Sequence, residues 1–138
     1  MTHSVLVVAH DNDTREVLRA ALEREGYEMM EAQNGAEGVR RLAESPPCVI
    51  ILEFEMPVMD GQDFRAIQKR LAPTVPIICI TAPDGADARA RLVGAAVLHV
   101  KPFEVHALSA SVRALCNTAH SHAAGREVTA PWRTRTLR

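Results

Sequence analysis

The sequence contains no apolar run approaching the roughly 18 residues that a helix needs to span a bilayer. Its first residues, M-T-H-S-V-L-V-V-A, lack the basic leader and the long apolar stretch of a signal peptide. Cysteine is scarce, with Cys48, Cys79 and Cys116 forming an odd and widely spaced set. These absences predict a cytoplasmic protein without a membrane segment, whose thiols are reduced and mostly buried rather than joined in a disulfide framework.

Three glycine-containing signatures are absent as well. The sequence has no G-x-x-x-x-G-K-[ST] phosphate loop, no G-x-G-x-x-G dinucleotide turn and no G-x-S-x-G nucleophile elbow. Nucleotide-binding and esterase functions therefore have no support in the sequence. We expect a protein that is not an enzyme and that needs no cofactor.

The charge of the chain is unevenly distributed. Residues 117–138 contain four arginines and one glutamate and so carry a formal charge of +3. Because the net charge of the whole chain is −1, the first 116 residues carry −4. A length of 138 residues, 47% of them hydrophobic, fits one compact domain. We expect this domain at residues 1–116, followed by a flexible, mildly basic tail at residues 117–138.

Short apolar runs alternate with segments of helical periodicity. The runs predict strands over residues 4–9, 27–32, 48–53, 77–81 and 97–100. Helices are predicted between Asp11 and Gly26 and over residues 36–44, 61–71, 84–93 and 104–115. In the first of them, Asp13 and Glu16 form a candidate capping box.

Five such strand–helix units predict an α/β fold, a parallel sheet with helices on both faces. The strands are continuously apolar, as expected for strands that are covered on both sides. The carboxyl ends of parallel strands meet at one edge, where ligand sites of such sheets usually lie. Polar residues follow four of these ends and should gather there: His10 and Asp11, Glu53, Thr81, and Lys101.

Residues 4–116 resemble the receiver domain of bacterial two-component response regulators. The resemblance rests on the order and spacing of V-L-V-V near the start, E-G-Y-E at 25–28, M-P-V-M-D-G at 56–61, I-T-A at 80–82 and V-K-P-F at 100–103. It implies a flavodoxin-like strand order 2-1-3-4-5. In the family, an aspartate after the third strand accepts a phosphoryl group from a histidine kinase, and two acids after the first strand hold Mg²⁺.

Part of the family's site is present. Thr81 matches the hydroxyl that bonds the phosphoryl oxygens, and Lys101 matches the lysine that pairs with them. The resemblance also implies a cis peptide bond between Lys101 and Pro102.

Other positions depart from the family. Glu53 stands in place of the acceptor aspartate, Ala9 and His10 stand in place of the metal-holding acids, and Asp11 comes one position too late. Leu98 replaces the switch aromatic, and a short segment before Lys101 predicts a trimmed fourth helix. Because a displacement of about 1 Å can slow a positioned reaction about 100-fold, we expect no phosphorylation and no Mg²⁺.

Two interpretations of Glu53 remain open and carry equal weight. Its carboxylate could reach both Lys101 and Thr81 and imitate part of a phosphoryl group, or it could form a plain ion pair with Lys101 in a retired site. His10 could add a proton-dependent charge beside Glu53, although a solvated loop histidine is the commoner arrangement.

The sequence thus favours a stand-alone degenerate receiver, or pseudo-receiver, that acts as a phosphorylation-independent protein-interaction module in bacterial signal transduction. The partners expected from the resemblance are a histidine kinase, a downstream signalling protein, or a second copy bound through the fourth helix, fifth strand and fifth helix. A first alternative is a working phosphoacceptor in which Asp11 and Glu53 hold a metal ion.

A second alternative is a nucleic-acid-associated protein that binds through the arginines and Trp132 of the basic tail. With four arginines against an acidic domain, we do not expect nucleic acid to be the partner. Cys116, His120 and His122 form a C-x₃-H-x-H pattern, but this pattern lacks a fourth metal ligand. An unrelated enzyme on the same fold is the most distant alternative.

Overall fold

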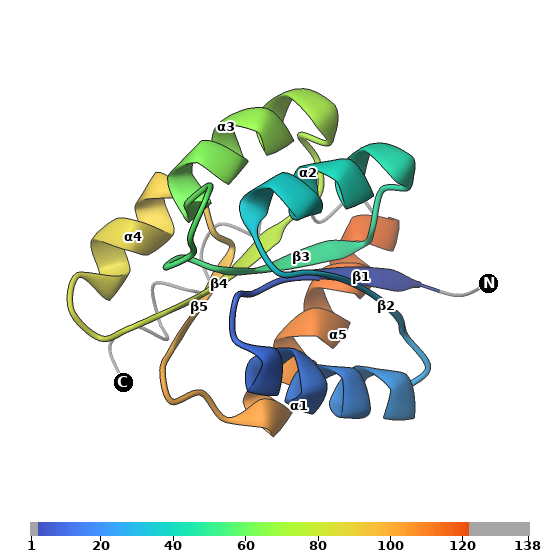
Figure 1. Ribbon diagram of the computed structural model, residues 1–138. Helices are drawn as coiled ribbons and strands as arrows, with labels where there is room; N and C mark the ends of the chain where they lie inside the picture. Colours follow the sequence, from blue (N-terminus) through green and yellow to red (C-terminus); the bar gives the residue numbers. More distant parts are fainter. Residues whose placement is uncertain (1–2, 122–138) are drawn as a thin grey trace.

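The structure is a computed structural model that describes residues 3–121 (Figure 1). In this part of the chain five strands alternate with five helices, which confirms the expected strand–helix repeat. The strands are β1 (Ser4–Val8), β2 (Glu28–Ala32), β3 (Val49–Glu53), β4 (Ile77–Thr81) and β5 (Val97–Val100). The helices are α1 (Asn12–Arg24), α2 (Gly35–Glu44), α3 (Gly61–Leu71), α4 (Ala86–Leu92) and α5 (Val105–Ser121). None of these helices is both long and apolar enough to cross a membrane.

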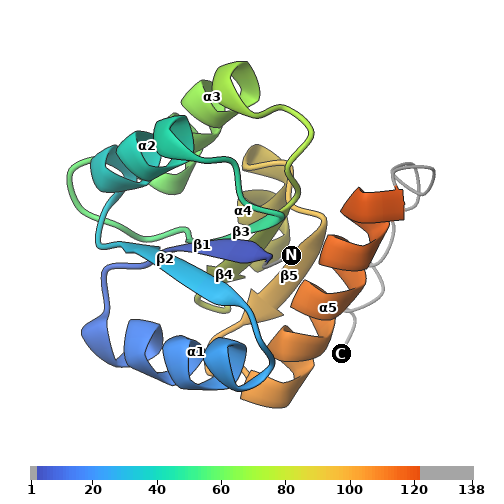
Figure 2. The ribbon, with the colours of Figure 1, turned by 90° about the vertical axis from the view of Figure 1, so that its right-hand side faces the viewer.

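The strands form one parallel sheet in the order β2-β1-β3-β4-β5, so the α/β class and the flavodoxin-like strand order are confirmed. Helices α2, α3 and α4 cover one face, and α1 and α5 cover the other (Figures 1 and 2). Glu53 pairs with Ile80, and Thr81 pairs with Val100. The ends of β3, β4 and β5 are therefore level at one edge of the sheet.

The core lies along the central strands. Residues 5–8 of β1 and every residue of β3 and β4 are buried, which explains why these runs do not alternate with polar residues. Helix α2 packs closely because Gly38 has no side chain. A Cβ at this position would lie 3.0 Å from both Phe64 of α3 and Val8 of β1.

The predicted capping box of α1 is wrong. The N-cap is Asp11, whose Oδ1 accepts a hydrogen bond from the Asp13 backbone N–H at 3.3 Å. The helix begins at Asn12, so Asp13 is already inside the first turn. The expected end is confirmed, since Gly26 follows α1 with φ of +90°, a conformation that a glycine adopts without strain.

The last two helices differ in length. Helix α4 has seven residues, which confirms the trimmed fourth helix expected from the sequence. Helix α5 runs to Ser121, beyond the end expected at residue 115, because no glycine or proline interrupts the chain there. The rest of the expected tail, with His122, Trp132 and the arginines, lies outside the described residues.

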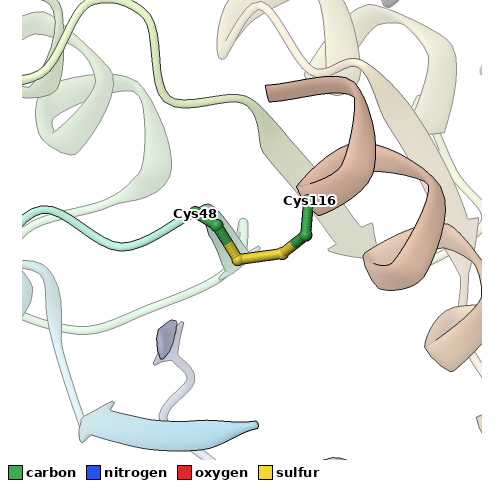
Figure 3. Close-up of a disulfide and its surroundings, with 2 residues drawn as sticks. All are labelled: Cys48 and Cys116. Atoms are coloured by element: carbon green, nitrogen blue, oxygen red, sulfur yellow. A yellow bond between two sulfur atoms is a disulfide. The ribbon is translucent and has the colours of Figure 1, made fainter. Parts of the chain in front are cut away.

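The cysteine prediction is wrong for two of the three thiols. Cys48 and Cys116 form a disulfide, whereas Cys79 is free and buried in β4 (Figure 3). The sequence could not show this pairing, because it depends on where α5 crosses back over the beginning of β3. The bond also removes the Cys116 thiolate from the C-x₃-H-x-H pattern as a metal ligand.

Candidate functional site

The carboxyl edge of the sheet brings together residues from four strand ends. Glu53 is the last residue of β3 and Thr81 the last of β4, while Lys101 follows β5 and His10 lies just beyond β1. The peptide bond between Lys101 and Pro102 is cis, as the family resemblance implied. Topology thus gathers Glu53, Thr81, Lys101 and His10 at one edge of the sheet.

Glu53 is buried and has a partner at each carboxylate oxygen. Its Oε2 lies 2.5 Å from Nζ of Lys101, and its Oε1 accepts a hydrogen bond from the His10 backbone N–H at 2.7 Å. Only 4% of Glu53 is exposed, so these contacts offset the loss of water around the carboxylate. Burial lowers the pKa of Lys101, but the hydrogen bond and charge of Glu53 outweigh it, and the net shift is upward.

A second carboxylate, Glu55, occupies the hydroxyl side of the site. Its Oε2 accepts hydrogen bonds from Oγ1 of Thr81 at 2.5 Å and from the Ala82 backbone N–H at 3.1 Å. Its Oε1 lies 3.5 Å from Nζ of Lys101. Burial raises the pKa of Glu55, but these hydrogen bonds and the Lys101 charge outweigh it and hold the pKa below its ordinary value.

Of the two contacts expected for Glu53, the structure shows only the one with Lys101. The Thr81 hydroxyl donates to Glu55 instead. Sequence reasoning missed Glu55 because this residue lies past the end of β3, where the strand's two-residue alternation no longer fixes the direction of a side chain. The available signal was a second glutamate two positions after the first.

Arg89 of α4 completes the cluster. Its Nη1 lies 2.7 Å from Oε2 of Glu55 and 3.1 Å from Oγ1 of Thr81. Its guanidinium also lies over the Phe54 ring, 5.5 Å from the ring centre. The two negative charges of Glu53 and Glu55 are therefore balanced by the two positive charges of Lys101 and Arg89. Arg89 also connects α4 to the loop that follows β3.

The positions that hold a metal ion in the family do not fit Mg²⁺ here. The side chain of Ala9 is buried and has no atom that could bind a metal ion. His10 is exposed, and its backbone N–H contacts Glu53. Asp11 caps α1, and a hydrogen bond from Thr14 at 2.8 Å lowers the pKa of its carboxyl. The guanidinium of Arg15 donates to the backbone oxygen of Ala9 at 2.6 Å, which adds positive charge. Mg²⁺ needs several oxygen ligands, and these residues do not supply them.

Leu98, at the position of the family's switch aromatic, is buried in β5. It belongs to the hydrophobic core, and its aliphatic side chain offers no polar edge. Among the side chains that the structure describes, which are those of residues 3–116, no group of three His, Cys, Asp or Glu is arranged to hold a metal ion.

Known proteins match both the sequence and the fold. Residues 5–113 match the family model of the response regulator receiver domain. The transcriptional regulatory protein PrrA of Mycobacterium tuberculosis is 35% identical over 113 residues, which make up 80% of this chain and 48% of that protein. The chain thus spans about half the length of the curated relatives it matches.

Solved structures agree with this match. Chemotaxis protein CheY4 of Vibrio cholerae gives a TM-score of 0.73 at 28% identity, covering 83% of this chain and 99% of that one. The signal receiver domain of a histidine kinase from Syntrophus aciditrophicus gives 0.76 at 30% identity, covering 84% and 91%. Fold, strand-end residues and sequence lead to one conclusion: the chain belongs to the response regulator receiver domain family.

Proposed function

We propose that this receiver domain is a pseudo-receiver, a phosphorylation-independent protein-interaction module in bacterial signal transduction. One observation carries the proposal. The groups that would receive the oxygens of a phosphoryl group already bind carboxylates of the same chain: Lys101 binds Glu53, while Thr81 and the Ala82 N–H bind Glu55.

Charge supports the same proposal. A phosphoryl group carries a charge between about −1.5 and −2 near neutral pH. The site already pairs Glu53 and Glu55 with Lys101 and Arg89, and it lacks the acids that would bring in a divalent cation. Transfer to Glu53 would convert its carboxylate into an acyl phosphate dianion beside the Glu55 carboxylate without a compensating divalent ion, which strongly disfavours the reaction.

Glu55, rather than Glu53, fits the part of an internal substitute for the phosphoryl group. Its carboxylate engages the threonine hydroxyl and the following backbone N–H. Glu53 fits the plainer role of a buried ion-pair partner for Lys101. In this proposal the domain remains in one state, with Thr81 held by Glu55 and α4 held by Arg89.

The module would then act through protein contacts, without enzymatic activity and without Mg²⁺. Its partners would be a histidine kinase, a downstream signalling protein or a second copy that docks on α4, β5 and α5, in the cytoplasm. The relative from Mycobacterium tuberculosis is a transcriptional regulatory protein, which suggests that such contacts serve gene regulation. A working phosphoacceptor built on Asp11 and Glu53 is not supported, because Asp11 caps α1 and Glu53 pairs with Lys101.

The test is intact-mass analysis after incubation with Mg²⁺ and acetyl phosphate, alongside an NMR titration with beryllofluoride. We expect no phosphoryl mass and unshifted amide signals at Glu53, Thr81 and Lys101. A matched variant combines Ala9→Asp, His10→Asp and Glu53→Asp with Glu55→Gln, and it should gain the phosphoryl mass. A phosphoryl group mapped to Glu53 in the wild-type chain, and lost in Glu53→Gln, would overturn the proposal.

A further inference from the structure

The disulfide lies at the opposite end of β3 from Glu53. Cys48 directly precedes the strand, whereas Glu53 is its last residue. Figure 3 shows the bond joining the beginning of β3 to α5. We propose that Cys48 and Cys116 form a reversible thiol–disulfide site, which exchanges with small thiols and disulfides and secures the end of α5 to the sheet only when oxidised.

The backbone holds the two cysteines ready to react. Their Cα atoms lie 5.2 Å apart, within the range of about 4.4 to 6.8 Å that a disulfide spans without backbone movement. The Cys48 N–H donates to the Ser4 backbone oxygen at 2.8 Å, which ties the residue to β1. Pro46 and Pro47 precede it and restrict the chain further. Bond formation therefore costs little additional ordering.

The two cysteine residues differ in exposure, which gives the exchange a direction. Cys48 is half-buried, whereas Cys116 is only 1% exposed. A small thiolate therefore attacks the Cys48 sulfur, forms a mixed disulfide there and releases Cys116 as a thiolate that takes up a proton. A second small thiolate then attacks the mixed disulfide and releases Cys48. Two small thiols are oxidised to one small disulfide, and the protein disulfide is reduced to two thiols.

The reverse exchange forms the bond. The Cys48 thiolate attacks a small disulfide and releases one small thiolate, and Cys116 then displaces the second from Cys48. The third cysteine does not take part. Cys79 is buried in β4, and burial raises its pKa to about 12, so that its thiol stays protonated near neutral pH.

The bond lies near the C-terminal end of α5. Near this end, Leu115 and Cys116 are buried, and Arg113 forms a surface ion pair with Glu25 at 2.9 Å. Exposed ion pairs contribute little to stability. Without the disulfide, α5 loses its covalent link to the beginning of β3, so local opening near Cys116 becomes more frequent. The redox state would thus control how rigidly α5 is held against the sheet, and with it how well ordered the outer face of this helix is.

Reversibility follows from the compartment expected for this chain. In reducing compartments disulfides are usually transient, and they often sense redox conditions. This inference does not depend on the absence of phosphorylation, because the sulfur atoms and the carboxylates lie at opposite ends of the strand.

The test equilibrates the full chain with glutathione buffers over a range of reduced-to-oxidised ratios. The thiols are then alkylated after unfolding and counted by mass. We expect one free thiol under oxidising conditions, three under reducing conditions, and a crosslinked Cys48–Cys116 peptide in the oxidised digest. Hydrogen exchange at the end of α5 should be faster in the reduced form by about tenfold or more, while the central strands change little.

Two variants provide the controls. Cys48→Ser replaces a half-buried residue and should show the fast exchange of α5 in every buffer, whereas Cys79→Ala should keep the full redox response. Three free thiols at every glutathione ratio would overturn the proposal, as would a bond that excess reduced glutathione leaves intact. Equal α5 exchange in the two forms would overturn the claim that the bond secures the helix.

Discussion

The hydroxyl of Thr81 donates to a carboxylate oxygen of Glu55 at 2.5 Å, so the residue that would bond a phosphoryl group bonds a side chain of its own domain. Three further groups surround this carboxylate: the Ala82 N–H, Arg89 and Lys101. This cluster leads to tests that separate the part played by Glu55 from the part played by Glu53.

Replacing Glu55 with alanine should destabilise the domain. The change leaves the Thr81 hydroxyl, the Ala82 N–H and Arg89 without their common acceptor, and we expect a loss of about 1–3 kcal/mol in the free energy of unfolding. Urea denaturation measures this loss. Glu28→Ala, at an exposed position of β2, is the matched control and should change stability by less than about 0.5 kcal/mol. Equal effects of the two substitutions would show that the cluster does not stabilise the fold.

Replacing Lys101 with methionine should leave Glu53 buried with only the His10 N–H as a partner. Because Lys101 is one-third exposed, we expect a loss of about 2–3 kcal/mol, below the range for a fully buried pair. Combining Lys101→Met with Glu53→Gln should recover part of the loss, since no unpaired buried charge remains. A double-mutant cycle measures this coupling. Additive effects would mean that the ion pair contributes no interaction energy.

The acid side of the stability curve should report on Glu55. Its pKa in the folded protein lies below the ordinary value of 4.5, so folding favours the ionised carboxylate. Its contribution is full above about pH 4.5 and is lost as the pH falls through the folded pKa. The difference in unfolding free energy between wild type and Glu55→Gln should therefore shrink as the pH falls. A constant difference from pH 7 to the acid limit would contradict this assignment.

Lys101 should act in the opposite direction at high pH. Its folded pKa is raised above 10.5, so its contribution is full below about pH 10.5 and is lost as the pH rises through the folded value. Thermal unfolding between pH 8 and pH 12 should show this loss in the wild type. Lys101→Met should lack this part of the alkaline decline.

Asp11→Ala distinguishes a helix cap from a metal ligand. Removing the cap should lower the free energy of unfolding, because the Asp13 N–H loses its side-chain acceptor. It should leave the response of the NMR spectrum to Mg²⁺ the same as in the wild type. A saturable Mg²⁺ response in the wild type that Asp11→Ala abolishes would support the alternative in which Asp11 and Glu53 hold a metal ion.

The sequence was sufficient for the sheet because its strands carry their own signal. The run C-V-I-I-L-E is typical of a strand covered on both faces, and regular alternation with helices implied parallel pairing. The partner of Glu55 depends on the path of an irregular loop after β3. The disulfide depends on where two elements 68 residues apart cross. Neither relationship has a local pattern, so only the assembled fold could reveal it.

The crosslink between Cys48 and Cys116 also changes the connectivity of the molecule. It closes the chain into a ring that contains β3, β4, β5, α3, α4 and most of α5, while β1, β2, α1 and α2 precede the ring. A protease that cuts once between these cysteines opens the ring but leaves both fragments joined. The oxidised domain therefore stays in one piece after a single nick, heavier only by the water that hydrolysis adds, whereas the reduced domain separates into two pieces once it unfolds.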